Sequence, residues 1–312
     1  MRVLALSILC VAGCDAVFGV KHVGPPPDAP IDAPILSGWK TVTAGVTHTC
    51  GIHADDTLWC TGANDIDQLG LGSLLPELDV MTQVGNAGWL TVTSSYNHTC
   101  GIQLDHSLWC WGLADQGQLG LGNNTHADTP TRVADGYRTV SAGTYHTCAI
   151  RDDDTLWCWG YNQTGQLGDG TTMQRVLPTQ VPGSWLDVSA GTSHTCGIRS
   201  DQSLWCWGDD YYGELGDGAN AMSPVPRAAA GGQSWTEIRT GASITCGRTT
   251  GGELRCAGYG GFGTLGSGTT QSSNTMQPVT IDGVDVTDWV HLGLDAYHAC
   301  GVRTDGTLWC WG

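Results

Sequence analysis

The sequence predicts an all-β protein, a β-propeller in which short strands recur at regular intervals. Twelve of its 14 cysteines form six pairs whose members lie ten residues apart. The first members recur about every 50 residues, at Cys50, Cys100, Cys148, Cys196, Cys246 and Cys300. The chain is also rich in Gly (46 residues) and Trp (14 residues), which suits tight turns and large anchoring side chains. A solenoid would also stack repeats, but solenoid repeats are usually shorter and contain fewer Trp.

The first residues predict export. Arg2 supplies a positive charge, and the apolar run that follows it is too short to span a bilayer. Residues 11–14, Val-Ala-Gly-Cys, resemble a bacterial lipobox, so we expect a signal peptide over residues 1–13 and a lipid on Cys14. Cleavage there also removes Cys10 and leaves twelve cysteines for pairing. The alternative is a secreted protein cleaved elsewhere, in which Cys14 has no such role.

Residues 14–38 are predicted to be a linker. The segment from Gly24 to Pro34 reads GPPPDAPIDAP, and such Pro-rich sequence favours an extended, semi-rigid spacer. Behind a lipid anchor, the spacer would hold a folded body clear of the membrane. We therefore expect a lipid-anchored protein of the bacterial cell envelope, at the outer membrane, the cell surface or the periplasmic face.

Residues 39–312 are predicted to hold the propeller repeats, at about 39–88, 89–136, 137–184, 185–234, 235–288 and, incomplete, 289–312. Each unit opens with an aromatic residue and an alternating run such as Trp89-Leu-Thr-Val, typical of a strand with one buried face. His-Thr-Cys, a polar turn and Leu-Trp-Cys-Trp-Gly then predict a hairpin. A Gly-rich turn such as residues 118–122 and a variable segment complete the unit.

The predicted hairpin explains the cysteine spacing. With its turn centred on residue 55, Cys50 and Cys60 lie opposite each other, with Cα atoms about 4.5–5.5 Å apart, within disulfide range. In an exported protein such pairs favour disulfides. We predict six: Cys50–Cys60, Cys100–Cys110, Cys148–Cys158, Cys196–Cys206, Cys246–Cys256 and Cys300–Cys310. His and two Cys per unit could instead ligate zinc, but the same set recurs five times, and a catalytic site seldom repeats around a ring.

These motifs resemble the regulator of chromosome condensation repeat over residues 39–312. The resemblance rests on His-Thr-Cys-x-Ile, Leu-Trp-Cys-Trp-Gly and Gly-Gln-Leu-Gly-x-Gly, and it implies a propeller that usually has seven four-stranded blades. The sequence given stops inside the motif, so we expect either a longer natural chain or an open or short ring. Unit five departs from the pattern, because Ile244 replaces His and Arg255 and Ala257 replace the two Trp.

Charge and motifs exclude several functions. The formal charge is −17, with 13 Lys and Arg against 30 Asp and Glu, so nucleic acid is not an expected partner. The nuclear prototype, a nucleotide-exchange factor on chromatin, is therefore a poor guide to function. A plant photoreceptor of the family carries Trp-Arg before His, whereas this chain has pairs such as Tyr96-Asn97. We found no catalytic motif and no calcium-loop spacing, and predict no catalytic residue, metal or cofactor.

The predicted function is binding rather than catalysis, with propeller loops engaging a protein or a cell-envelope ligand. A secreted family member that inhibits β-lactamase acts in this way. The resemblance places the interaction surface just before His, and Tyr is favoured in recognition, so the candidate binding residues are Tyr96, Asn97, Tyr145 and Tyr297. The alternative is a propeller enzyme, a lyase or hydrolase acting on polysaccharide or peptide. It would need clustered carboxylates with shifted pKa values at one end of the channel.

Overall fold

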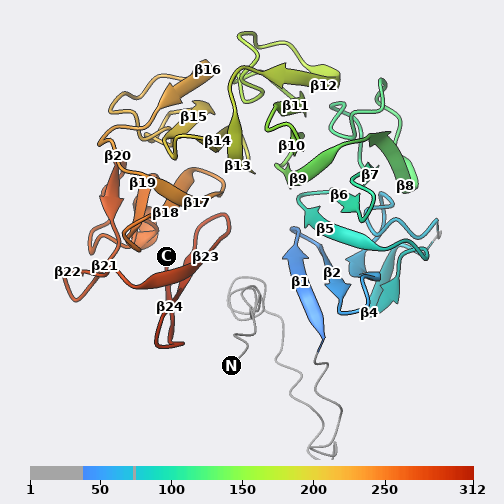
Figure 1. The fold of residues 1–312 in the computed structure, drawn as a ribbon, viewed down its shortest axis with the longest axis horizontal. Coiled ribbons are helices and arrows are strands. Elements are labelled where there is room, and N and C mark those ends of the chain that lie inside the picture. The colour runs from blue at the N-terminus through green and yellow to red at the C-terminus, as the bar shows by residue number, and fades with distance from the viewer. Residues whose placement is uncertain (1–37, 73–74) are drawn as a thin grey trace, which may run out of the picture.

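The computed structural model describes residues 38–72 and 75–312. In these residues, six antiparallel sheets of three or four strands lie around a common centre, and each of the six is one blade of a β-propeller (Figure 1). The predicted all-β fold class is therefore confirmed. The predicted signal peptide, the lipidation site Cys14 and all of the predicted linker except Gly38 lie outside the described residues.

The first five blades each contain four strands that pair in chain order. They are β1 (Trp39–Ala44), β2 (His48–His53), β3 (Leu58–Ala63) and β4 (Glu77–Gln83); β5 (Trp89–Ser94), β6 (His98–Gln103), β7 (Leu108–Gly112) and β8 (Ala127–Ala134); β9 (Tyr137–Ala142), β10 (His146–Arg151), β11 (Leu156–Gly160) and β12 (Arg175–Val181); β13 (Trp185–Ala190), β14 (His194–Arg199), β15 (Leu204–Gly208) and β16 (Ser223–Ala228); β17 (Trp235–Thr240), β18 (Ile244–Thr249), β19 (Leu254–Gly258) and β20 (Ser273–Pro278).

The sixth blade has three strands, β23 (Trp289–Leu294), β24 (Ala299–Arg303) and β25 (Leu308–Trp311). A small hairpin of β21 (Thr280–Ile281) and β22 (Val284–Asp285) precedes it. The arc is open between β1 and the sixth blade (Figure 1), and seven blades in a complete ring stays a prediction. The helical content of the described residues is one 3-10 turn, η1 (Gly261–Gly263), and none of their helices could span a membrane.

A disulfide joins the second and third strands of every blade. All six predicted cysteine pairs are linked, and in each pair the Cα atoms are 4.1 Å apart. This is slightly closer than expected for opposed residues on adjacent strands, because the sulfur–sulfur bond draws the two backbones together. Each disulfide therefore fixes the register of its hairpin.

The turn of each hairpin is held by a recurring chain of hydrogen bonds. In the second blade, Asp105 Oδ1 accepts from the backbone N–H of Ser107 at 3.0 Å, and Trp109 Nε1 donates to Ser107 Oγ at 2.7 Å. Blades one, three, four and six repeat this arrangement with Ser or Thr. In the fifth blade Arg255 replaces the Trp, and its Nε donates to Glu253 Oε2 at 2.8 Å. A side-chain hydrogen bond therefore still stabilises the turn of the fifth blade, although its sequence departs from the repeat pattern.

The interior of each blade is built on an aromatic ring that lies over a small residue. Trp89 in β5 is buried and packs on Gly101, where an added Cβ would lie 2.7 Å from the ring. Blades one, four, five and six pair Trp with Gly in the same way. In the third blade the smaller Tyr137 stands in place of Trp, and Ala149 stands in place of Gly. The two positions therefore vary together to keep the interior filled.

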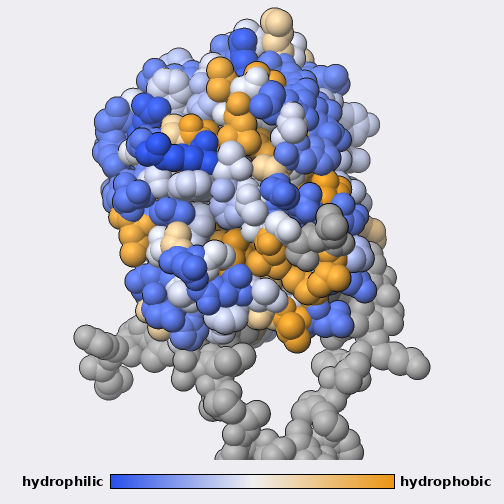
Figure 2. Space-filling view, turned by 90° about the vertical axis from the view of Figure 1, so that its right-hand side faces the viewer, coloured by the Kyte–Doolittle hydropathy of each residue, from blue (hydrophilic) through white to orange (hydrophobic). Residues whose placement is uncertain are grey.

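One side of the propeller has a mainly hydrophilic surface. Figure 2 shows the side that carries β4 and β8 in Figure 1, with separate apolar patches on a largely polar surface. One exposed apolar side chain there is Val80 of β4. Single exposed apolar residues of this kind are normal on protein surfaces.

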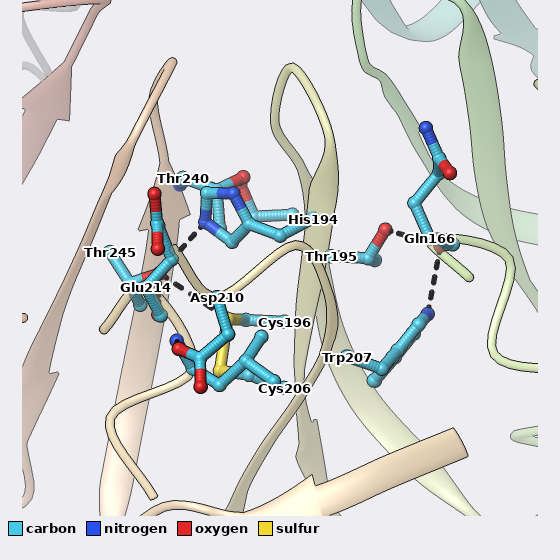
Figure 3. The surroundings of a disulfide bond; sticks show 12 residues. Gln166, His194, Thr195, Cys196, Cys206, Trp207, Asp210, Glu214, Thr240 and Thr245 are labelled. Carbon is cyan, nitrogen blue, oxygen red and sulfur yellow. Dashed lines mark hydrogen bonds between the residues drawn. A yellow bond between two sulfur atoms is a disulfide. The ribbon is translucent and has the colours of Figure 1, made fainter. Parts of the chain in front are cut away.

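Buried hydrogen bonds join each of the first four blades to the next. His194 Nε2 lies 2.9 Å from Thr245 Oγ1 of the following blade, and the Thr245 hydroxyl donates to the carbonyl of Glu214 at 2.7 Å (Figure 3). Because that hydroxyl proton is used, the imidazole must be the donor to Thr245. Burial lowers the pKa of His194 to about 4, which keeps the ring neutral. Equivalent bonds start from His48, His98 and His146.

Candidate functional site

Two sets of loops meet at one end of the propeller. The loop after the first strand and the loop after the third strand of a blade are joined by backbone hydrogen bonds, such as Leu113 N–H to Asn97 O at 2.8 Å and Tyr161 N–H to Tyr145 O at 2.8 Å. We call this end the aromatic face. It comprises residues 45–47, 95–97, 143–145, 191–193, 241–243 and 295–297, together with 63–72, 75–76, 113–126, 161–174, 209–222 and 259–272.

Seven of the eight Tyr of the chain, and Phe262, lie on the aromatic face. Three of them form one chain of rings, in which the centroids of Tyr96 and Tyr145 are 5.7 Å apart and those of Tyr145 and Tyr161 are 6.4 Å apart. The other five form a second group, which we call the Tyr259 cluster: Tyr211, Tyr212, Tyr259, Phe262 and Tyr297. Edge-to-face contacts of this kind hold rings in place.

Many of these rings are open to solvent. Tyr211 and Phe262 are each 74% exposed, Tyr297 55%, Tyr96 38% and Tyr212 37%. The large Trp side chains of the first strands are by contrast buried, apart from the half-buried Trp39. A group of exposed aromatic rings marks an interaction surface more often than a structural feature.

The predicted binding residues are only partly brought together. Tyr96 and Tyr145 are in contact, but Tyr297 belongs to the Tyr259 cluster. Asn97 is partly buried, and its carbonyl accepts the bond from Leu113. The sequence reasoning missed Tyr161, Tyr211, Tyr212, Tyr259 and Phe262. A signal was present, because these five lie at the start of the Gly-rich turns, close after the third strands, which a hairpin blade returns to the same end.

The aromatic face is strongly acidic. Its loops contain no Lys or Arg. Their acidic residues are Asp65, Asp67, Asp115, Asp169, Asp209, Asp210, Glu214, Asp217 and Asp295. Asp169 and Asp217 are paired with Arg175 and Arg227 of the neighbouring outer strands. The face as a whole therefore has a negative potential.

Two of these carboxylates have raised pKa values, but both accept backbone hydrogen bonds within their own loop. Burial raises the pKa of Asp210 to about 6 and that of Glu214 to about 7. Asp210 accepts the N–H of Leu215 at 3.0 Å and of Ala221 at 2.9 Å, and Glu214 Oε2 accepts the N–H of Tyr212 at 2.8 Å. The third blade has Asn162 and Gln166 in these positions with similar bonds. The pair thus shapes the turn and is not arranged as a catalytic acid and base.

A central cavity of about 480 Å³ lies between the first strands. Its wall is rich in Ser and Thr, and Thr43 Oγ1 accepts the N–H of Ser94 in the next blade at 3.0 Å. Thr93, Ser141 and Ser189 make corresponding bonds to their next blades. Arg239 lies 3.8 Å from Asp187 and 2.9 Å from Glu237, and burial raises the pKa of Asp187 above its usual value. The clustered free carboxylates that the enzyme alternative needs are not found in the described part of this wall.

No group of His, Cys, Asp and Glu among the described residues is arranged to hold a metal. The cysteines that might have ligated zinc are joined as disulfides, and His48, His98, His146 and His194 donate to Thr of the next blade. The exposed aromatic rings of the aromatic face and the carboxylates around them are the groups that could contact a ligand. The candidate site is therefore an exposed surface, formed by the loops at one end of the propeller.

The class of protein is therefore a disulfide-stapled β-propeller with a loop face suited to binding. The regulator of chromosome condensation (RCC1) repeat matches residues 105–150 and 153–198, and a second description of the same repeat matches residues 137–166 and 185–214. Residues 105–214 thus match this repeat, in line with the sequence motifs quoted above. No curated protein sequence is significantly similar to the chain.

Solved structures share the fold at low sequence identity. Human WBSCR16 is 21% identical with a TM-score of 0.75, and the match covers 84% of this chain and 71% of that one. Yeast RCC1 (Prp20), bound to Kap60, is 16% identical with a TM-score of 0.77, covering 88% and 70%. The ectodomain of the receptor kinase CR4 from Physcomitrella patens is 20% identical with a TM-score of 0.58, covering 88% and 64%. These likenesses establish the fold.

Proposed function

We propose that the protein is an exported, membrane-tethered scaffold that binds a protein, or another ligand of the cell envelope, through its aromatic face. The observation that carries this proposal is the gathering of seven Tyr and Phe262 on one end of the propeller, with Tyr211 and Phe262 mostly exposed. Tyr supplies a large contact area with few side-chain rotations to freeze, which is why it is favoured at interfaces.

Rigidity supports a binding role. Six disulfides tie the hairpins, and buried bonds such as that between His146 and Thr195, 2.8 Å apart, tie neighbouring blades. A surface fixed before it meets its partner loses little conformational entropy on binding. The loops of the aromatic face are thus presented on a frame that is already ordered.

Export and tethering rest on the sequence and on the disulfides. Paired cysteines persist in oxidising compartments, which fits the signal peptide expected over residues 1–13. Lipid on Cys14 and a spacer over residues 14–38 would then hold the propeller away from the membrane. We test this part by metabolic labelling with a fatty acid. We expect labelled wild type and unlabelled Cys14→Ala, and equal label in both would contradict the anchor.

Structural relatives give further support for a protein partner. Yeast RCC1 (Prp20) was solved bound to Kap60, and Prp20p is described with binding to Gsp1p and histones. Those partners are known for the relatives alone, and the aromatic face of the present chain is acidic and lacks Lys and Arg. A propeller of this type is nevertheless a suitable frame for protein binding.

The binding face is tested by placing a photo-crosslinking amino acid at single positions in the lipoprotein expressed in its own cells. Tyr211 and Tyr96 sample the aromatic face, and exposed Leu104, in the turn between β6 and β7, samples the opposite end. We expect the same discrete adduct from both Tyr positions and none from Leu104. Adducts from Leu104 alone, or from no position, would contradict the proposal.

A further inference from the structure

The Tyr259 cluster spans the loops of blades four, five and six. Tyr259 is its centre, with ring centroids 4.9 Å from Tyr212, 6.3 Å from Phe262 and 6.4 Å from Tyr297. Tyr211 extends the cluster at 4.8 Å from Tyr212. The centre is half-buried while the outer rings are exposed. The cluster therefore offers several ring faces and edges to one ligand.

Carboxylates flank the cluster on both sides. Asp209 is two residues before Tyr211, and Asp295 is two residues before Tyr297 and exposed. Each of these carboxylates accepts only the N–H of the residue that follows it, at 3.0 Å and 2.7 Å. Neither is in an ion pair among the described residues. Both therefore keep oxygen atoms and negative charge for a ligand.

Every cation in the described part of the chain already has a partner. Lys40 and eight of the Arg lie within salt-bridge distance of Asp or Glu. Arg151 and Arg199 instead lie over aromatic rings, with Arg199 3.7 Å from the centroid of Trp205. Among residues 38–72 and 75–312, no Lys or Arg is thus left unpaired for the acidic aromatic face. It also stacks guanidinium groups on rings inside its own blades, which is the favourable arrangement of a cation–π contact.

The backbone at Phe262 adds support. This residue has φ of 61° and ψ of 10°, in the left-handed region that favours Gly. Gly at this site would remove the strain, yet a bulky ring is held there and is largely exposed. Strain of this kind tends to occur at functional positions.

We propose that the Tyr259 cluster is a recognition site for Lys and Arg side chains, and that its occupant is a basic segment of a protein partner. This inference rests on the proposed function, since it names the chemistry of the ligand for the same face. Exposed rings attract the cation through their π electrons, and Asp209 and Asp295 add charge at the edges. A neutral saccharide could also stack on Tyr, but it would gain nothing from the charge of the face.

The test measures binding of three labelled peptides of equal length to the full-length lipoprotein in detergent, by fluorescence anisotropy. The peptides alternate Gly with Arg, Gln or Glu. We expect binding of the Arg peptide alone, weakened by salt. Tyr211→Ala and Phe262→Ala should each weaken it about two- to fivefold, as expected for one exposed cation–π contact. Both side chains are largely exposed, so the fold should tolerate the changes, and thermal unfolding of each variant checks this.

Matched controls separate the site from the overall charge. Asp295→Asn should weaken the Arg peptide more than Asp79→Asn, which makes the same charge change on β4 of the first blade. Equal effects of these two variants, or equal binding of the three peptides, would overturn the inference. Binding of an envelope glycan that the Arg peptide does not displace would also overturn it, in favour of saccharide recognition.

The peptide and crosslinking experiments fail independently. Adducts from Tyr211 without a preference for the Arg peptide would leave the binding face standing and refute the cationic ligand. A specific Arg-peptide complex without any adduct in cells would support the chemistry of the cluster and refute the proposed function.

Discussion

His146 Nε2 lies 2.8 Å from Thr195 Oγ1, across the boundary between the third and fourth blades. The Thr195 hydroxyl in turn donates to the carbonyl of Gln166 at 2.8 Å, and Trp207 Nε1 donates to the same carbonyl at 2.9 Å. In the first three Gly-rich turns, one Gln carbonyl therefore accepts hydrogen bonds from both a Thr and a Trp of the following blade. This arrangement explains why His, Thr, Gln and Trp recur together in the repeat.

The boundary between blades five and six shows what happens when this arrangement is absent. Ile244 replaces His, and Ala299 stands where the next blade should offer Thr. Both are buried. Ile244→His alone should destabilise by about 1–3 kcal/mol, because the imidazole would be buried without an acceptor. Adding Ala299→Thr should recover part of the loss. Chemical denaturation of the four proteins measures the coupling, and strictly additive effects would contradict the pairing.

Acid should destabilise the propeller. Burial lowers the pKa of His48 and His194 to about 4 and of His98 and His146 to about 3, whereas unfolded His has a pKa near 6.5. Between these values the unfolded chain binds more protons, so the free energy of unfolding falls as pH drops from about 7 towards 4. Each pKa unit corresponds to roughly 1.4 kcal/mol per histidine. Denaturation at stepped pH measures this, and a flat profile would contradict it.

Ionisation of Glu214 should lower the free energy of unfolding as pH rises, which is opposite to the effect of the histidines. Its pKa is raised to about 7, so the stability it contributes in the protonated form is lost as pH rises through 7. Glu214→Gln, which restores the residue found at Gln166, should therefore raise the free energy of unfolding at pH 8 by about 2–3 kcal/mol. The difference should shrink as pH falls and vanish well below the unfolded pKa of 4.5, where Glu is protonated in both states. An unchanged or less stable variant at pH 8 would argue against this assignment.

Inside each blade an aromatic ring packs on Gly or Ala, so a substitution at one of these two positions should be compensated by a substitution at the other. Gly101→Ala should destabilise by about 1–3 kcal/mol, because the new Cβ meets the buried ring of Trp89 at 2.7 Å. In the third blade, Tyr137→Trp should be destabilising beside Ala149 and should be relieved by Ala149→Gly. Thermal unfolding of the single and double variants tests this. If Ala149→Gly gave no relief, the two positions would not be coupled.

The sequence was most informative about single blades. Cysteines ten residues apart with a polar turn between them determine a hairpin, so the pairing of Cys100 with Cys110 follows from local spacing. Contacts between blades were not accessible in the same way. In unit five, Ile244 and Ala257 depart from the repeat pattern and suggested a degenerate repeat. The structure shows a compensating residue for each: Ala299 replaces the Thr that would have paired with His at position 244, and Met276 packs beside Ala257. These partners lie in other strands or blades, and only the three-dimensional register shows that they meet.

The candidate site could likewise be predicted only in part, because some of its contacts join residues from different blades. Tyr96 and Tyr145 were chosen from their position before His, and they are in contact. Tyr212 and Tyr259 come from the longer Gly-rich turns of different blades and meet at 4.9 Å. No local pattern links two residues so far apart in the chain, so the Tyr259 cluster emerged only from the fold.

The central claim, that the aromatic face is covered by a partner, is tested most directly by hydroxyl-radical footprinting of the lipoprotein in intact cell envelopes and after purification. Mass spectrometry compares the oxidation of exposed Tyr211, Phe262 and Tyr297 with that of Leu104 at the opposite end. We predict that the three aromatic residues are protected in the envelope and become reactive on purification, while Leu104 reacts equally in both. Equal reactivity of the aromatic residues in both preparations would contradict the claim.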